Sequence, residues 1–229
     1  MDDAKHAQAK RTKAWTRLLD EIEAEARDTA TWTGRKRFSD RVMAAIASVP
    51  RHRFVPAHEA TAAYINRPLP IGHGQTISQP YMVAVMTDLL DLGTTDRVLE
   101  VGTGCGYQAA ILATVAARVY SIEVVPELAR DAAERLASLG YDNVEVRAGD
   151  GFAGWAEEAP FDAVIVTAAP ERVPPALIDQ LKPGGRMVIP IGPDRDLQIL
   201  HVGAKAQDGT FKTVPTLPVA FVPMVPGKN

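Results

Sequence analysis

The stretch Val98-Leu99-Glu100-Val101-Gly102-Thr103-Gly104-Cys105-Gly106-Tyr107 decides the fold of this chain. Residues 98–101 form a short, mostly apolar run that predicts a buried strand, and a helical run at 107–117 follows the glycines. Glycines at a strand-to-helix turn let the backbone approach a ligand without a side-chain clash. Because ligands of an open parallel sheet bind at the carboxyl ends of its strands, this loop is the first candidate binding site.

Apolar runs alternate with helical segments after this loop. Strands are predicted at 98–101, 119–122, 144–146, 163–166 and 187–189, and helices at 107–117, 126–139 and 175–181. Such alternation is typical of βαβ units and a parallel sheet. The runs 197–202 and 214–222 are separated by a turn at Asp208-Gly209, which predicts an antiparallel hairpin. We therefore expect an α/β fold with a Rossmann-like, doubly wound, mostly parallel sheet and a C-terminal antiparallel hairpin.

Residues 1–37 are polar and helical in character. Apolar residues recur there at steps of three and four, namely Trp15, Leu18, Leu19, Ile22 and Ala26. This stripe predicts a helix that packs on the main body, which we favour over a docking arm for a partner. A second helix is predicted at 40–49, with Ser39 as its cap and Pro50 after its end.

The segment from Tyr64 to Pro80 has no clear period. Breakers of regular structure recur within it, namely Pro68, Pro70, Gly72, Gly74 and Pro80. Three apolar residues lie among them, so we predict a packed, irregular segment rather than a linker. Segments of this kind are uncommon in compact domains and often functional. A helix is predicted at 82–90.

Composition narrows the class of protein. The chain has 229 residues, of which 46% are hydrophobic and 23% charged, as in ordinary globular proteins. A net charge of -3 argues against a dedicated nucleic-acid binder. Cys105 is the single cysteine, so neither an intrachain disulfide nor a cysteine-based metal site is expected. The N-terminus is charged and lacks the apolar core of a secretory signal, and no apolar run in the sequence approaches the length needed to span a bilayer. We therefore expect a cytoplasmic location.

Two classes of cofactor compete for the glycine loop. A nicotinamide or flavin dinucleotide needs Gly-x-Gly-x-x-Gly, but Tyr107 stands at the sixth position counted from Gly102. The carboxylate of Glu100 would repel a pyrophosphate and suit a cationic ligand. S-adenosylmethionine carries a sulfonium and an ammonium group, so it fits this loop better. A tight strand-to-helix turn without a ligand remains the alternative.

Acidic residues follow two further predicted strands. Glu123 ends the second strand, near the position where an acid holds ribose hydroxyls. Asp150, in Gly149-Asp150-Gly151, follows the third strand and could accept a hydrogen bond from an adenine amino group. The alternatives are a solvated charge for Glu123 and a cap before Phe152 for Asp150. Three such features at successive strand ends favour a site for S-adenosylmethionine.

The chain resembles the protein-L-isoaspartate O-methyltransferases, chiefly through Pro68-Leu69-Pro70-Ile71-Gly72 and Gly74-Gln75-Thr76-Ile77-Ser78-Gln79-Pro80. The similarity runs from about Phe38 to the end and includes 98–107, 149–151, 160–163, 167–169, 181–185 and 221–223. It departs from the family at Ala220, where bacterial relatives often have arginine, and at Cys105, where serine is frequent. The stretch before Phe38 is longer than is typical.

The resemblance implies a protein-repair methyltransferase of the class I fold, in the domain 38–229 behind a helical extension at 1–37. Its substrates would be S-adenosylmethionine and the α-carboxylate of L-isoaspartyl residues in damaged proteins and peptides, with S-adenosylhomocysteine as a product. A monomer without nucleic-acid or membrane partners is implied. The implied catalytic residue is Ser78. Implied cofactor contacts are Thr76, Ile77, Ser78, Glu100, Gly102, Gly104, Glu123, Asp150 and Gly151. Implied substrate contacts are Pro70, Ile71, Thr167, Ala168, Phe221, Val222 and Pro223.

This chemistry needs no general base, because a carboxylate with a pKa of roughly 3.5 is ionised at neutral pH. We expect Ser78 to orient the acceptor by a hydrogen bond, although spacing alone favours a cap for the helix after Pro80. We also expect the 64–80 segment to cover the cofactor and exclude water. The alternatives are a methyltransferase for another carboxylate or for nucleic acid, a silent S-adenosylmethionine-binding module and a dinucleotide oxidoreductase.

Overall fold

A seven-stranded sheet forms the centre of this computed structural model, which describes residues 2–193 and 197–227, with side chains from Thr12 onward. The strand order is β5-β4-β3-β6-β7-β8-β9. The strands are β3 (Arg97–Val101), β4 (Arg118–Glu123), β5 (Val144–Ala148), β6 (Phe161–Val166), β7 (Leu181–Ile191), β8 (Gln198–Lys205) and β9 (Phe211–Val219). Neighbours from β5 to β7 pair in parallel, and β7, β8 and β9 pair antiparallel. The predicted fold class is confirmed.

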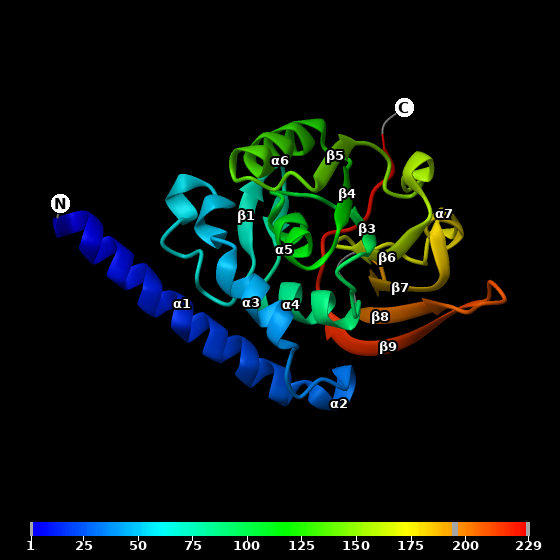
Figure 1. Ribbon diagram of the computed structural model, residues 1–229, viewed down its shortest axis with the longest axis horizontal. Helices are drawn as coiled ribbons and strands as arrows, with labels where there is room; N and C mark the ends of the chain where they lie inside the picture. The colour runs from blue at the N-terminus through cyan, green and yellow to red at the C-terminus, as the bar shows by residue number, and fades with distance from the viewer. Residues whose placement is uncertain (1, 194–196, 228–229) are drawn as a thin grey trace.

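Helices cover both faces of this sheet (Figure 1). They are α3 (Asp40–Ser48), α4 (Pro80–Leu89), α5 (Tyr107–Val115), α6 (Pro126–Ser138) and α7 (Pro175–Asp179), with short 3₁₀ turns at η1 (Arg51–Arg53), η2 (Ala57–Glu59) and η3 (Ala156–Glu158). Along β3, Val98 packs into the core beneath α3, α4 and α5, whereas Leu99 packs into the core on the α7 side. Both faces of the strand are therefore buried, which explains its nearly continuous apolar sequence.

Strand β7 begins at Leu181, six residues before its predicted start at 187. Helix α7 ends at Asp179, before its predicted end at 181. The sequence Lys182-Pro183-Gly184-Gly185 is typical of a turn. Here it lies within the strand, and the pairing of β7 with β6 shifts register between Phe161 and Ala163. The irregular register accommodates the turn-forming residues in the sheet.

The segment before α4 contains a hairpin where the sequence predicted no regular element. Strands β1 (Leu69–Gly72) and β2 (Gln75–Ile77) pair antiparallel, and His73 and Gly74 between them have φ of +52° and +70°. Positive φ at both turn positions is typical of tight hairpins. The prediction was wrong because each strand of a two-stranded sheet is an edge, where Pro70 is tolerated.

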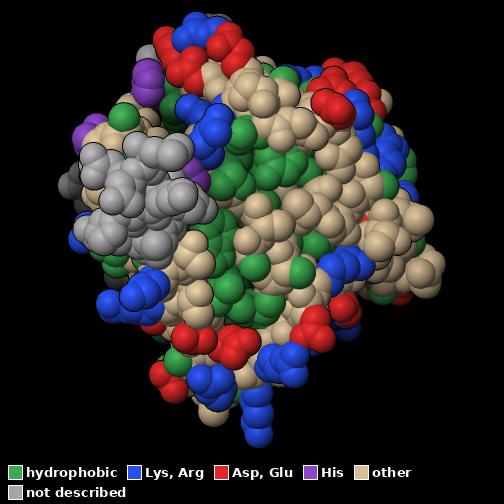
Figure 2. Space-filling view, turned by 60° about the vertical axis from the view of Figure 1, so that its left-hand side comes forward, with side chains coloured by type: hydrophobic (Ala, Val, Ile, Leu, Met, Phe, Trp, Pro, Cys, Tyr) green, Lys and Arg blue, Asp and Glu red, His purple; other side chains and the backbone are tan. Residues whose placement is uncertain are grey.

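The N-terminal helix α1 (Asp2–Asp28) runs along the body and extends beyond it at its N-terminal end, and the short helix α2 (Ala30–Thr33) follows (Figure 1). Leu18, Ile22 and Ala26 are buried in the core shared with α3 and α4, which confirms that the predicted stripe packs on the body. No helix in the described ranges is long and apolar enough to cross a bilayer. Figure 2 shows Lys and Arg intermixed with Asp and Glu around a hydrophobic centre on one face.

Candidate functional site

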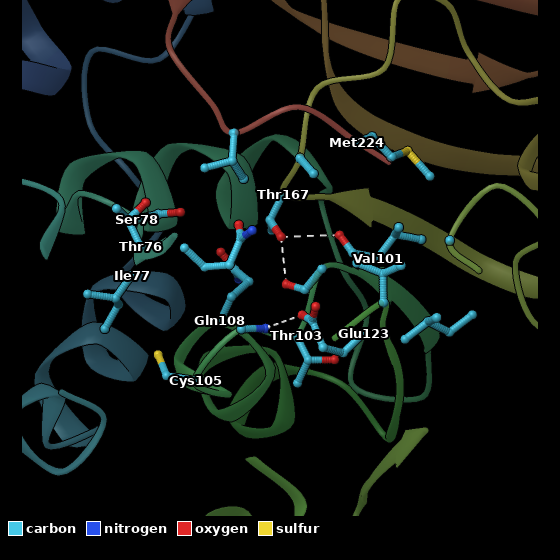
Figure 3. A pocket seen from close by; sticks show the side chains of 18 of the residues that line it. Thr76, Ile77, Ser78, Val101, Thr103, Cys105, Gln108, Glu123, Thr167 and Met224 are labelled. Carbon is cyan, nitrogen blue, oxygen red and sulfur yellow. Dashed lines mark hydrogen bonds between the residues drawn. The ribbon is translucent and has the colours of Figure 1, made fainter. Parts of the chain in front are cut away.

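A cavity lies at the carboxyl ends of β3, β4 and β6 (Figure 3). The space between its walls, including the open mouth, is about 800 Å³. Its described lining comprises Gln75–Ser78, Val83, Val101–Cys105, Tyr107, Gln108, Ile122–Val124, Gly151, Thr167, Ala168 and Val222–Val225. Segments from six parts of the chain thus meet at one edge of the sheet.

The glycine loop forms the floor of this cavity. Gly102 has a φ of +99°, and a Cβ there would lie 2.4 Å from Thr167 Oγ1. The Thr167 hydroxyl donates to the carbonyl of Gly102 at 2.6 Å, with a longer contact to that of Val101 at 3.1 Å. Only glycine fits this position without displacing the end of β6, and the backbone of the loop stays open to a ligand.

Glu123 ends β4 and faces the cavity. Its Oε2 accepts a hydrogen bond from the Gly104 amide at 2.7 Å, and its Oε1 accepts one from the Val125 amide at 3.0 Å. The side chain is only 5% exposed, so the carboxylate is held in one place. Each oxygen keeps capacity for a further donor, such as a hydroxyl of a bound ligand.

Glu100 lies outside the lining of the cavity and is fully buried in the sheet. Ser121 donates a hydrogen bond to its Oε2, and Ser121 in turn contacts Thr103, which does line the cavity, at 2.6 Å. Glu100 Oε1 has no hydrogen-bond partner, and burial raises the pKa of Glu100 to about 8. Glu100 is thus linked to the cavity lining through two hydroxyl groups, and its direct contact with a cofactor stays a prediction.

Asp150 and Gly151 follow β5 but differ in their position. Gly151 lines the cavity, and a Cβ there would lie 2.5 Å from Val101 and 3.0 Å from the end of Met224. Asp150 is outside the lining, and its Oδ1 accepts a hydrogen bond from the Phe152 amide at 2.9 Å. This bond matches the alternative we considered for Asp150, although a turn rather than a helix follows it.

Ser78 stands between β2 and α4. Helix α4 begins at Pro80, and its N-cap Gln79 makes no side-chain cap bond. The side chain that reaches the helix start is Asn66, which accepts a hydrogen bond from the Tyr81 amide at 3.0 Å. Ser78 is thus not the cap that spacing alone favoured, and it lines the cavity instead.

The C-terminal segment crosses the mouth of the cavity. Ala169, after β6, donates to the Val222 carbonyl at 2.8 Å and accepts from the Met224 amide at 2.9 Å. The buried side chain of Gln198 donates to the carbonyl of Phe221 at 3.1 Å and accepts from its amide at 2.7 Å. These bonds place Val222 and Pro223, two of the predicted substrate contacts, in the lining.

A second cavity adjoins the first and shares part of its wall. The residues common to both are Thr76, Ser78, Thr167 and Val222. The rest of its described lining is Glu25, Pro68, Gln79, Tyr81, Met82 and Leu217–Phe221. We call this second cavity the acceptor groove. Phe221 thus lies in the groove rather than in the first cavity.

Two predicted substrate contacts lie in the β1–β2 hairpin and line neither cavity. Pro70 is exposed and pairs with Thr76 across the hairpin. Ile71 packs on the glycine loop, because a Cβ added at Gly104 would lie only 3.3 Å from Ile71 Cδ1. Ile71 therefore supports the loop from the hairpin.

Sequence reasoning missed several lining residues. Gln108, in the first turn of α5, donates through Nε2 to the Thr87 hydroxyl at 2.9 Å. A polar residue in the first turn of a mostly apolar helix is a signal that could have identified it. Met224 and Val225 directly follow the predicted 221–223 element, but nothing local marks them. Glu25 reaches the groove only because α1 packs against α4.

Comparison with known proteins shows the family. The family model described as protein-L-isoaspartate(D-aspartate) O-methyltransferase (PCMT) matches residues 31–229. The chain belongs to the protein-L-isoaspartate O-methyltransferase family. A curated member, protein-L-isoaspartate O-methyltransferase 2 of Syntrophobacter fumaroxidans, is 58% identical over 93% of this chain and 87% of its own length. The Polaromonas sp. protein of the same name is 56% identical over 90% of this chain and 98% of its own.

Solved structures of the family share this fold. A protein-L-isoaspartate O-methyltransferase aligns with a TM-score of 0.76 at 27% identity, covering 90% of this chain and 65% of that one. The Plasmodium falciparum protein, described as a putative member of the same family and solved with S-adenosyl-L-homocysteine, has a TM-score of 0.76 at 24% identity. The alignment covers 92% of this chain and 98% of the Plasmodium falciparum protein. At this identity the match supports the fold alone.

Proposed function

We propose that this enzyme transfers a methyl group from S-adenosylmethionine to the α-carboxylate of L-isoaspartyl residues in damaged proteins and peptides. The observation that carries the proposal is the shared wall of the two cavities. A glycine-floored cavity with a fixed carboxylate meets a groove suited to an extended peptide, and Ser78 stands between them. Identity of 58% to a curated family member supports the same activity.

The first cavity fits S-adenosylmethionine in shape and charge. Its floor has no side chain at Gly102. Gly151 leaves no room for a side chain either, because a Cβ there would lie 2.5 Å from Val101. Glu123 can accept hydrogen bonds from ribose hydroxyls with the oxygen capacity that its two backbone bonds leave free. The apolar walls at Ile122 and Met224 suit an adenine ring. When bound, S-adenosylmethionine supplies an electrophilic methyl group.

The chain's own residues position the acceptor rather than activate it. A substrate carboxylate with a pKa of roughly 3.5 is already ionised at neutral pH, so no proton has to be removed. Consistently, no histidine is among the described residues lining the first cavity. Alignment of two reactants can contribute roughly 7–11 kcal/mol to lowering a barrier. We assign this alignment to the wall between cavity and groove.

Ser78 is the residue best placed to orient the carboxylate. It is half-buried, lines both cavities and is not engaged in capping α4. A hydroxyl that donates to an ionised acceptor forms one of the stronger hydrogen bonds. Thr167, on the same wall, already donates its proton to backbone carbonyls, so its oxygen is left only as an acceptor. Ser78 is therefore the preferred donor.

We also propose the finer features that the family resemblance implies. Residues 38–229 form the methyltransferase domain, residues 1–37 form a helical extension, and the enzyme acts as a monomer in the cytoplasm. The mass of the chain, 24.7 kDa, allows light scattering on a sizing column to distinguish a monomer from a dimer. A dimer peak would contradict the monomer.

A peptide comparison tests the activity. Purified enzyme with methyl-labelled cofactor should methylate an isoaspartyl peptide and leave the aspartyl peptide of the same sequence unlabelled. Equal labelling of both peptides, or labelling of small carboxylates alone, would indicate a different carboxyl methyltransferase. Cofactor binding by calorimetry with no labelling of any peptide would indicate a silent binding module.

A further inference from the structure

The acceptor groove contains one charged side chain among its described lining residues, and it comes from α1. This residue is Glu25, on the buried side of the helix, near its C-terminal end. The remaining lining is apolar or neutral and includes Ala220 and Phe221. The family model begins at residue 31, so Glu25 lies in the part of the chain before the matched region.

Hydrogen bonds hold the Glu25 carboxylate against the segment that carries Ser78. Its Oε2 accepts from Asn66 Nδ2 at 2.8 Å and from Gln79 Nε2 at 3.1 Å. Its Oε1 has only a long contact to Gln79 Nε2, at 3.3 Å. Because Gln79 directly follows Ser78, the carboxylate lies close to the place proposed for the acceptor.

No cation balances this carboxylate in the described part of the chain. The partners of Glu25 are neutral amides, and none of the ion pairs formed by side chains from Thr12 onward includes it. Burial raises the pKa of Glu25, while the hydrogen bonds from Asn66 and Gln79 act in the opposite direction. A half-buried carboxylate with a weakly used oxygen is a favourable site for a cationic group.

We infer that Glu25 selects substrates with a basic side chain close to the isoaspartyl residue. The inference rests on the proposed function, because it places a peptide in the acceptor groove with its α-carboxylate at Ser78. A neighbouring lysine or arginine then reaches Glu25 Oε1, whereas an acidic neighbour meets a like charge. N-terminal helix α1 thereby contributes to substrate choice.

A peptide series tests this inference. Isoaspartyl peptides are compared that are identical except for one residue, which is Lys, Ala or Glu. This residue is placed in turn at each of the two positions before and the two positions after the damaged residue. At one or more positions the wild-type kcat/KM for the Lys peptide should exceed that for the Glu peptide by about tenfold, the size expected of a charge-assisted hydrogen bond. In Glu25→Gln the ratio should approach one, since glutamine keeps an acceptor for Asn66 but loses the charge.

Glu23→Gln is the matched control, because Glu23 lies on the same helix, is exposed and is outside the groove. It should keep the wild-type ratio. The inference would be overturned if the wild-type enzyme showed no charge preference, or if Glu25→Gln kept the wild-type kcat/KM ratio of the Lys to the Glu peptide. Loss of activity by Glu25→Gln on all peptides alike would also overturn it. The ratio compares peptides that are all methylated, so failure of the proposed function, seen as no methylation at all, is a separate result.

Discussion

The hydroxyl of Thr167 occupies the space that a side chain at Gly102 would need. Gly102 directly follows β3 and Thr167 directly follows β6, and the hydroxyl donates to the Gly102 carbonyl at 2.6 Å. A Cβ at Gly102 would lie 2.4 Å from Thr167 Oγ1. The end of β6 is therefore packed directly on the glycine loop, and the shape of the cavity floor depends on this contact.

Gly102→Ala should weaken both the fold and the cofactor site. The positive φ of +99° and the clash with Thr167 together should lower the free energy of unfolding by about 1–3 kcal/mol. Urea denaturation measures this loss, and calorimetry with S-adenosylhomocysteine should show weaker binding. Gly140→Ala is the control, because φ there is +81° but no atom lies within 4 Å of a Cβ. Equal effects of the two variants on binding would contradict the role of the Thr167 contact.

Ser78→Ala should lower kcat with an isoaspartyl peptide by about 10- to 100-fold, the loss expected when a hydrogen bond to a charged group is removed. The Kd for S-adenosylhomocysteine should change little, because the hydroxyl acts on the acceptor. Ser48→Ala removes an exposed hydroxyl at the end of α3 and should behave as wild type. Unchanged kcat and KM in Ser78→Ala would remove Ser78 from the mechanism.

Glu100 should make stability depend on pH. Burial raises the pKa of its carboxyl from 4.5 to about 8, so the folded chain keeps a proton that the unfolded chain has lost between these values. The free energy of unfolding should therefore fall as pH rises from 4.5 to 8, by an amount on the order of a few kcal/mol. Urea denaturation at pH 5 and pH 8 measures the change.

The Glu100→Gln variant should lose most of this pH dependence, because glutamine does not titrate. Glu145→Gln is the matched control: Glu145 is exposed on β5, so the control should keep the wild-type slope. Parallel stability curves for wild type and Glu100→Gln would show that Glu100 is not the responsible group.

Gln198→Ala should loosen the C-terminal segment at the mouth of the cavity. The change removes the hydrogen bonds that hold both backbone groups of Phe221, each contributing about 1 kcal/mol. We expect the KM for the peptide to rise several-fold and the segment after β9 to become more sensitive to limited proteolysis. Gln207→Ala, at an exposed position in the β8–β9 turn, should leave both unchanged.

Local patterns predicted much of this molecule. Buried strands such as 163–166 and the glycine loop were recognisable because their signals lie in neighbouring residues, whose spacing reflects the geometry of a strand or a turn. The β1–β2 hairpin was missed because Pro70 and Gly72 are breakers in most contexts. Pairing with Gln75–Ile77 across a tight turn makes those residues compatible with an edge strand.

The sequence by itself therefore determined the α/β class, the position of the glycine loop and the family resemblance. Tertiary structure alone decided that Glu100 lies beneath the cavity while Glu123 lines it, since their places in the two strands do not show which way each side chain points. It also decided that Met224 and Glu25, from opposite ends of the chain, line adjoining cavities. The physical reason is that packing of α1 and of the C-terminal segment joins surfaces far apart in sequence, which no local pattern encodes.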